Sequence, residues 1–288
     1  LAIVEVSRFV PLHLQEGLHD TIEGLLHEAG LHTTEASDHP LGIGMFAFAN
    51  SFIRDTAVNT TFQLDDEDLV GMDVSGEKLE KWLESGGMER FVIALLGMGG
   101  LGKTTLAANV YRNERNKFQC HAWVSISQTY SREAVLRNII KELFKDTASG
   151  PSNIAAMDIT SLEETLKRYL EQMKYLIILD DVWTPDAFDD LSKTLVCNGK
   201  GSRLIITTRQ GDVAALASQG HILTLEPLPE DKAWDLFCKK SFPKETNHHC
   251  PEELRLLSEE ILSKCKGLPL AIVSVGSLLH VREKTVEE

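Results

Sequence analysis

Apolar and polar residues follow two different patterns along this chain. From about residue 65 onward, short apolar runs alternate with segments in which apolar residues recur every three or four positions. The short runs predict buried strands and the recurring spacing predicts amphipathic helices. Their alternation is typical of an α/β fold with a parallel sheet covered by helices. The predicted strands are residues 91–96, 121–125, 175–179, 203–208 and 222–225.

The pattern changes after Pro227 and Pro229, where only helical spacing is found. Prolines interrupt helices and central strands, so this pair predicts a junction. We therefore expect an α/β domain at residues 65–228 and a small all-helical subdomain at residues 229–288. Within the α/β domain, Ser161 and Glu164 stand at the spacing of a capping box, which predicts the start of a helix.

Residues 1–64 form a poorly defined N-terminal extension. One amphipathic helix ending near Gly30 is predicted there. Five of the ten histidines of the chain also lie here, and at helical spacing His13, His19 and His27 point in different directions. This favours solvated side chains over a metal site. The apolar residues that share one face of the predicted helix are Leu14, Leu18, Ile22, Leu25 and Ala29.

The charge balance narrows the range of partners. A formal net charge of -14 repels polyanions, which argues against nucleic acid and acidic membrane surfaces. The longest apolar stretch, residues 268–281, is shorter than the roughly 20 residues of a membrane span, so it predicts a buried helix and no span. Five cysteines at irregular spacing favour reduced thiols in the cytoplasm over a disulfide framework.

The strongest chemical signal is a glycine-rich loop between the strand at 91–96 and a helix, which matches the phosphate-loop pattern G-x-x-x-x-G-K-[ST]. Glycines let successive backbone N–H groups turn toward phosphates, and the helix adds its positive N-terminal end. Lys103 is predicted to reach the outer phosphates and the Thr104 hydroxyl to bind Mg²⁺. The sequence therefore predicts a purine nucleoside di- or triphosphate. The predicted phosphate-binding residues are Gly97, Met98, Gly99, Gly100, Leu101, Gly102, Lys103, Thr104 and Thr105.

Two carboxylates, Asp180 and Asp181, follow the apolar run at residues 175–179. In phosphate-loop proteins an acid at the carboxyl end of such a strand faces the nucleotide, so Asp180 is predicted to hold Mg²⁺. Asp181 could orient or deprotonate a water for attack on the terminal phosphate, which makes it, with Lys103, a candidate catalytic residue. The alternative is that the two acids only end the strand and open a turn.

Arg209 follows the strand at 203–208, at the sheet edge where ligands bind in open α/β sheets. It could touch a terminal phosphate and so report its presence. The alternative is a surface arginine at the start of the next helix.

Several of these motifs, in this order and spacing, resemble the nucleotide-binding NB-ARC domain of plant disease-resistance proteins, the nucleotide-binding leucine-rich-repeat family. Trp183, directly after Val182, resembles the coiled-coil, non-Toll branch of that family. The resemblance extends over about residues 65–285. The segments that carry it are residues 97–105, 176–183, 201–209 and 267–271.

The resemblance implies a P-loop NTPase that works as a switch in plant defence signalling and the hypersensitive response, closed with ADP and open with ATP. It implies slow Mg²⁺-dependent ATP hydrolysis, other immune-signalling proteins as partners, and oligomer formation on activation. By motif matching, Val70 and Gly71 lie beside the adenine, Pro269 packs near the base, and Arg209 senses the terminal phosphate. For Pro269 a helix break and restart after Gly267 is the alternative. The choice of adenine over guanine rests on the resemblance alone.

The chain starts at Leu1 rather than Met and ends at Glu288. In the family a winged-helix subdomain, a Met-His-Asp motif and leucine-rich repeats follow, so we expect a receptor truncated before them. Three functions stay open: a nucleotide-dependent switch, a P-loop kinase, and a degenerate receptor fragment that acts as an interaction module. We favour the switch, because a kinase needs a basic lid and no arginine-rich lid segment is visible.

Overall fold

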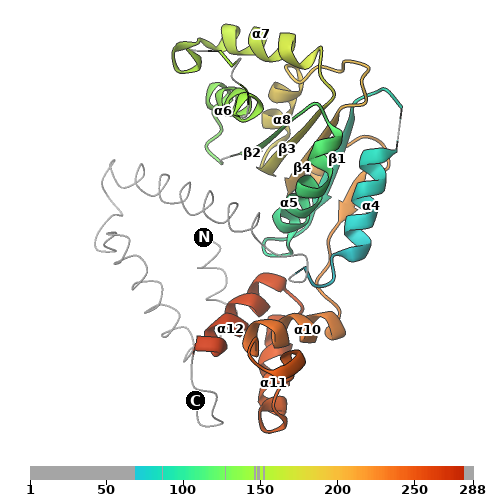
Figure 1. Cartoon of the computed structure of the whole chain (residues 1–288), viewed down its shortest axis with the longest axis vertical. Coiled ribbons are helices and arrows are strands. Elements are labelled where there is room, and N and C mark those ends of the chain that lie inside the picture. The colour runs from blue at the N-terminus through green and yellow to red at the C-terminus, as the bar shows by residue number, and fades with distance from the viewer. Residues whose placement is uncertain are drawn as a thin grey trace, which may run out of the picture. The chain divides into compact units, whose positions relative to one another are not determined.

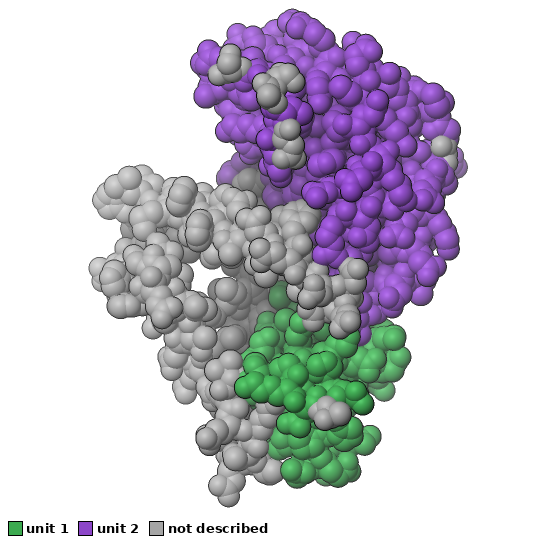
Figure 2. Space-filling model, in the orientation of Figure 1, with its two compact units in different colours: residues 1–60, 227–288 green, residues 61–226 purple. Residues whose placement is uncertain are grey.

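The computed structural model describes residues 69–281 except 86, 127, 146, 148, 149 and 152. It divides the chain into two compact units with a boundary between Glu226 and Pro227. Their described parts are residues 69–226 and 227–281, coloured purple and green in Figure 2. The predicted N-terminal helix and its histidines lie outside the described residues.

The first unit is built on a five-stranded sheet, which confirms the predicted α/β fold. All strand pairs are parallel, and the strand order is β2-β3-β4-β1-β5. Strands buried on both faces carry nearly continuous Val, Ile and Leu runs, which is why short apolar segments were sufficient to predict them. The strands are β1 (Phe91–Leu96), β2 (Cys120–Ser125), β3 (Tyr175–Val182), β4 (Arg203–Thr208) and β5 (Ile222–Thr224).

Helices cover both faces of this sheet (Figure 1). On one face α5 packs against β1, β3 and β4, and α4 packs on α5. On the other, Val92 and Ala94 of β1 share a core cluster with apolar residues of α6, α7, α8 and α9. Because side chains alternate along a strand, Ile93 and Leu95 face α5. The helices are α4 (Asp73–Glu84), α5 (Lys103–Glu114), α6 (Arg132–Phe144), α7 (Ile159–Leu170), α8 (Pro185–Ser192) and α9 (Gly211–Ala214).

The start of α7 differs from its prediction. The helix begins at Ile159, and the carboxylate of Asp158 accepts a hydrogen bond of 2.8 Å from the backbone N–H of Ser161. This hydrogen bond lowers the pKa of Asp158. Ser161 is therefore the third helical residue, and the capping box predicted from Ser161 and Glu164 was wrong. Asp and Ser are both good N-cap residues, and the earlier one took the position.

The second unit consists of helices, as predicted for the segment after the two prolines: α10 (Glu230–Ser241), α11 (Arg255–Cys265) and α12 (Pro269–Val281). The α10 and α12 backbones approach closely, since a Cβ added to Gly276 would lie 2.8 Å from Lys240 Cβ. The left-handed Gly267 (φ +69°) precedes Pro269, and its carbonyl accepts the Leu228 N–H. Within the described part of the chain, no helix combines the length and apolar character that a membrane crossing requires.

Candidate phosphate-binding site

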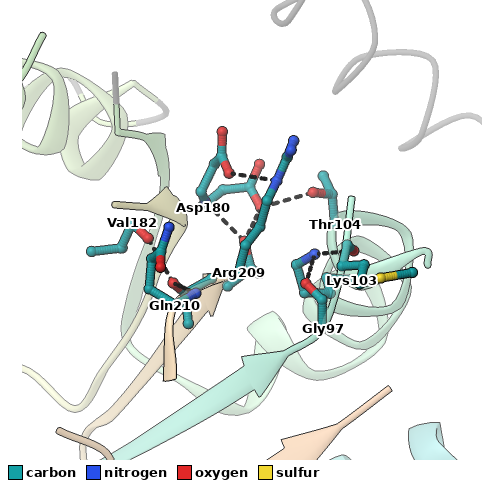
Figure 3. Close-up of polar contacts among 11 residues, drawn as sticks. Gly97, Lys103, Thr104, Asp180, Val182, Arg209 and Gln210 are labelled. Atoms are coloured by element: carbon teal, nitrogen blue, oxygen red, sulfur yellow. Dashed lines mark hydrogen bonds and ion pairs between the residues drawn. The ribbon is translucent and has the colours of Figure 1, made fainter. Parts of the chain in front are cut away.

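The strand order brings three predicted motifs to one edge of the sheet. Strand β4 lies between β1 and β3, and all three run in the same direction. The loop after β1, the paired acids of β3 and Arg209 after β4 therefore meet at their carboxyl ends, where open α/β sheets bind ligands. Figure 3 shows Arg209 rising between Asp180 on one side and Lys103 with Thr104 on the other.

The glycine-rich loop turns directly into α5. Gly100 and Gly102 have φ values of +82° and +89°, in the left-handed region that favours glycine. The first turn of α5 holds Lys103, Thr104 and Thr105. The Lys103 ammonium folds back along the loop and donates hydrogen bonds of 2.7 Å to the carbonyls of Gly97 and Met98. The predicted loop residues thus form one continuous turn around the start of a helix, which is a favourable arrangement for an anion.

Lys103 is buried with only 7% of its surface exposed, and its charge is poorly solvated. Burial, followed by the nearby positive charge of Arg209, lowers the pKa of Lys103 to about 8, although the Asp181 and Asp180 carboxylates act in the opposite direction. Two cations that repel each other beside a helix N-terminus favour an anion between them.

Asp180 and Thr104, the two predicted Mg²⁺ ligands, lie in contact. The Thr104 hydroxyl donates a hydrogen bond of 2.9 Å to Asp180 Oδ1, and the Thr207 hydroxyl donates one of 2.7 Å to the same oxygen. Burial raises the pKa of Asp180, and the two hydroxyl donors oppose this. Carboxylate and hydroxyl oxygens are the donors that Mg²⁺ accepts in nucleotide sites, so the residues present fit this ion.

Asp181 is directed toward the same edge by an irregularity in β3. Leu179 pairs with Ile206 and Val182 pairs with Thr208, so β3 has one residue more than β4 at this point. Asp181 itself is left-handed, with φ +58°, an uncommon conformation that Asp tolerates better than most residues. In a regular strand Asp181 would point to the face opposite Asp180. The bulge therefore brings both carboxylates to one rim.

Arg209 lies at the centre of the cluster. Its Nε is 3.9 Å from Asp181 Oδ1, and its guanidinium carbon is 5.3 Å from the centroid of the Trp183 ring. The guanidinium also lies next to Gly99 of the phosphate loop, since a Cβ added to Gly99 would be 2.9 Å from Arg209 Nη1. Its side chain is 35% exposed, so Arg209 lies at the surface of the unit, and its role toward a terminal phosphate stays a prediction.

Two residues of the site were missed by sequence reasoning. The Thr207 hydroxyl accepts the backbone N–H of Asp181 at 2.8 Å while it donates to Asp180, so it supports both acids. Met72 lies so close to the loop that a Cβ added to Gly102 would be 2.5 Å from its Cε. The position of Thr207 at the end of a predicted strand was a usable signal. Met72 gave no comparable signal, because Gly102, its neighbour in space, is distant from it in the sequence.

The residues predicted to lie near the base belong to different units of the chain. Val70 and Gly71 form a turn directly before Met72, and Gly71 has φ +74°. Through Met72 this turn leads to the phosphate loop. Pro269 is the first residue of α12 in the second unit, directly after the left-handed Gly267 and Leu268. Its role near a base stays a prediction.

The chain is similar to several known proteins. The family model described as the NB-ARC domain matches residues 72–247. The disease resistance protein RPM1 of Arabidopsis thaliana is 38% identical over 75% of this chain and 24% of its own length. The disease resistance protein RPP13 of the same plant is 37% identical over 70% of this chain and 24% of its own length. The chain thus spans about a quarter of these relatives.

A solved structure also shows a likeness. The signal transduction ATPase with numerous domains from Pyrococcus horikoshii, which carries a tetratricopeptide repeat sensor, aligns with 19% identity and a TM-score of 0.43. The alignment covers 73% of this chain and 30% of that chain.

Proposed function

Because this chain belongs to the NB-ARC domain family, we propose that it binds ADP and ATP with Mg²⁺ and acts as the nucleotide-dependent switch of a plant innate-immune receptor. The observation that carries the proposal is the meeting of Lys103, Asp180 and Arg209 around one glycine-rich loop. The family match and the resistance-protein relatives support a nucleotide-binding module of the immune-receptor type.

The residues divide the work of binding. The loop from Gly97 to Gly102 offers backbone N–H groups and the N-terminal end of α5, and Lys103 and Arg209 offer positive charge. Thr104 and Asp180 would hold Mg²⁺, which when bound neutralises charge on the phosphates. Val70 and Gly71 are our proposed contacts for the adenine.

We assign slow hydrolysis of ATP to Asp181. Its carboxylate lies on the rim beside Arg209, where it can orient a water and accept the proton that the water loses on attacking the terminal phosphate. Lys103 would stabilise the charge that develops on the phosphate oxygens. A slow reaction fits a reset of the switch better than metabolic turnover.

The cellular setting is part of the same proposal. All five cysteines are free thiols, which agrees with a reducing compartment, and we propose the cytoplasm. Other immune-signalling proteins are the proposed partners, with oligomer formation on activation. Since the chain spans about a quarter of its relatives, these properties concern the receptor of which it would form part.

The direct test identifies the nucleotide that accompanies the purified chain. We expect the denatured protein to release ADP in a near-stoichiometric amount. The Lys103→Ala variant should release little, because it removes the cation that spans the loop.

The matched control is Lys193→Ala, which removes an exposed lysine at the end of α8, away from the loop. It should keep the parent's ADP content. Equal ADP in Lys103→Ala and Lys193→Ala would reject the site, and release of GDP would reject the adenine assignment.

A further inference from the structure

Three segments of the first unit together hold the Arg209 side chain. Asp181 at the bulge of β3 gives an ion pair of 3.9 Å, and the Trp183 ring lies 5.3 Å from the guanidinium carbon. The third contact is the phosphate loop at Gly99. Arg209 is exposed at the surface, yet neighbours from three separate segments restrain its guanidinium.

Gly99 gives the most specific evidence. It is absent from the glycines with positive φ, so its backbone conformation would suit any residue. A Cβ added there would lie 2.9 Å from Arg209 Nη1, 3.1 Å from Cζ and 3.4 Å from Nη2, and these are its three nearest atoms. The first two distances are shorter than ordinary carbon contacts. A side chain at position 99 would therefore have to displace the Arg209 guanidinium from this place.

Electrostatics explain why the arginine needs holding. Arg209 and Lys103 are both cations on this rim of the sheet, so their charges repel each other. Asp181 supplies the opposite charge, and the face of an aromatic ring such as Trp183 attracts a guanidinium. These two contacts offset the repulsion and keep the arginine beside the loop.

We infer that Gly99, Asp181 and Trp183 hold the Arg209 guanidinium against the phosphate loop, and we call these three residues the seat. A terminal phosphate can then bind Arg209 only by competing with the Asp181 carboxylate. The inference rests on the proposed function, since it assigns a regulation to that same site. A diphosphate leaves Arg209 in the seat, whereas a triphosphate must draw it out. The strength of the seat therefore sets the preference for ADP over ATP.

The test measures the affinities of ADP and ATP, each with Mg²⁺, by calorimetry. The ATP measurement is completed before one turnover of hydrolysis has taken place. Trp183→Leu removes the aromatic face and should raise the ratio of ATP affinity to ADP affinity about two- to fivefold. Trp183→Phe keeps a ring and should stay close to the parent. Both substitutions are repeated in an Arg209→Ala chain, where the ratio should no longer respond to position 183.

Each outcome separates the seat from the proposed function. An unchanged ratio in Trp183→Leu, or the same change in the Arg209→Ala chain, would overturn the seat while nucleotide binding stands. A parent chain that binds neither nucleotide would overturn the proposed function instead.

A second measurement needs no nucleotide. The NMR signal of the Arg209 Nε–H group, identified by its loss in Arg209→Lys, should move in Trp183→Leu and stay near its place in Trp183→Phe. A signal unaffected by Trp183→Leu would contradict the seat, whatever the nucleotide measurements give.

Discussion

The phosphate loop and the ends of β3 and β4 meet at one site but are constructed differently. From Gly97 to Gly102 the chain offers mainly backbone groups, and four of its six residues are glycine. At the strand ends the groups are side chains, supported by one hydroxyl and one left-handed aspartate. Under the proposed function, the loop binds phosphate groups through its backbone N–H groups, whereas the side chains at the strand ends distinguish a triphosphate from a diphosphate. Substitutions in the two regions should therefore affect different measurements.

The largest expected effect comes from Asp181→Ala at the strand ends. Loss of the proposed proton acceptor should slow ATP hydrolysis about 100-fold, while ADP binding is retained. Phosphate release under single-turnover conditions checks this, with Asp189→Ala, an exposed acid on α8, as the control. A turnover rate equal to that of Asp189→Ala would remove Asp181 from the mechanism.

The next effect belongs to the loop. Gly102→Ala combines a left-handed backbone with a Cβ 2.5 Å from Met72 Cε, so ADP affinity should fall by about tenfold or more. Gly220→Ala is a matched control, since Gly220 has φ +80° but nothing within 4 Å of the added Cβ. Both should lose about 1–2 kcal/mol of unfolding free energy from backbone strain, and only Gly102→Ala should lose affinity. Equal affinities would mean that the loop tolerates a side chain there.

A smaller effect separates two neighbouring threonines. Thr207→Val removes the hydroxyl that is hydrogen-bonded to Asp180 and to the backbone N–H of Asp181. The Mg²⁺ concentration for half-maximal hydrolysis should then rise several-fold, because one lost hydrogen bond costs about 1 kcal/mol. Thr208→Val removes hydrogen bonds to Val182 O and from Gln210 N. It should lower thermal stability but leave the Mg²⁺ requirement unchanged, and Thr207→Ser should restore the parent value. The same Mg²⁺ shift in both valine variants would show that Thr207 acts through stability alone.

The smallest effect concerns backbone strain at the bulge. Asp181→Gly and Asp181→Ala both remove the carboxylate, but only glycine adopts φ +58° without cost. The glycine variant should be more stable than the alanine variant by about 1 kcal/mol in denaturant unfolding. Equal stabilities would mean that the bulge rearranges when the carboxylate is lost.

The two regions were also unequally predictable. The loop follows from the sequence, because glycine spacing and the flanking strand and helix are local signals. The strand ends required more: the apolar run ended the third predicted strand at Leu179, whereas β3 continues through a bulge to Val182. Thr207 gained its role from β4 lying beside β3, and pairing between distant strands cannot be read from local pattern. The capping prediction at α7 failed for another reason, since Asp158 and Ser161 are both suitable N-cap residues and lie only three positions apart.

The strand order also governs when the site forms during synthesis. β1 pairs with β4 and β5, and Phe91 aligns with Arg203, more than a hundred residues later in the chain. A ribosome adds about 5–20 residues per second, so several seconds pass between the synthesis of β1 and that of β4, the first strand that pairs with it. During that time the six apolar residues of β1 lack their native strand partners, and exposed apolar surface of this kind promotes aggregation. Nucleotide would enter only after β4 has emerged, as a late step that completes the fold.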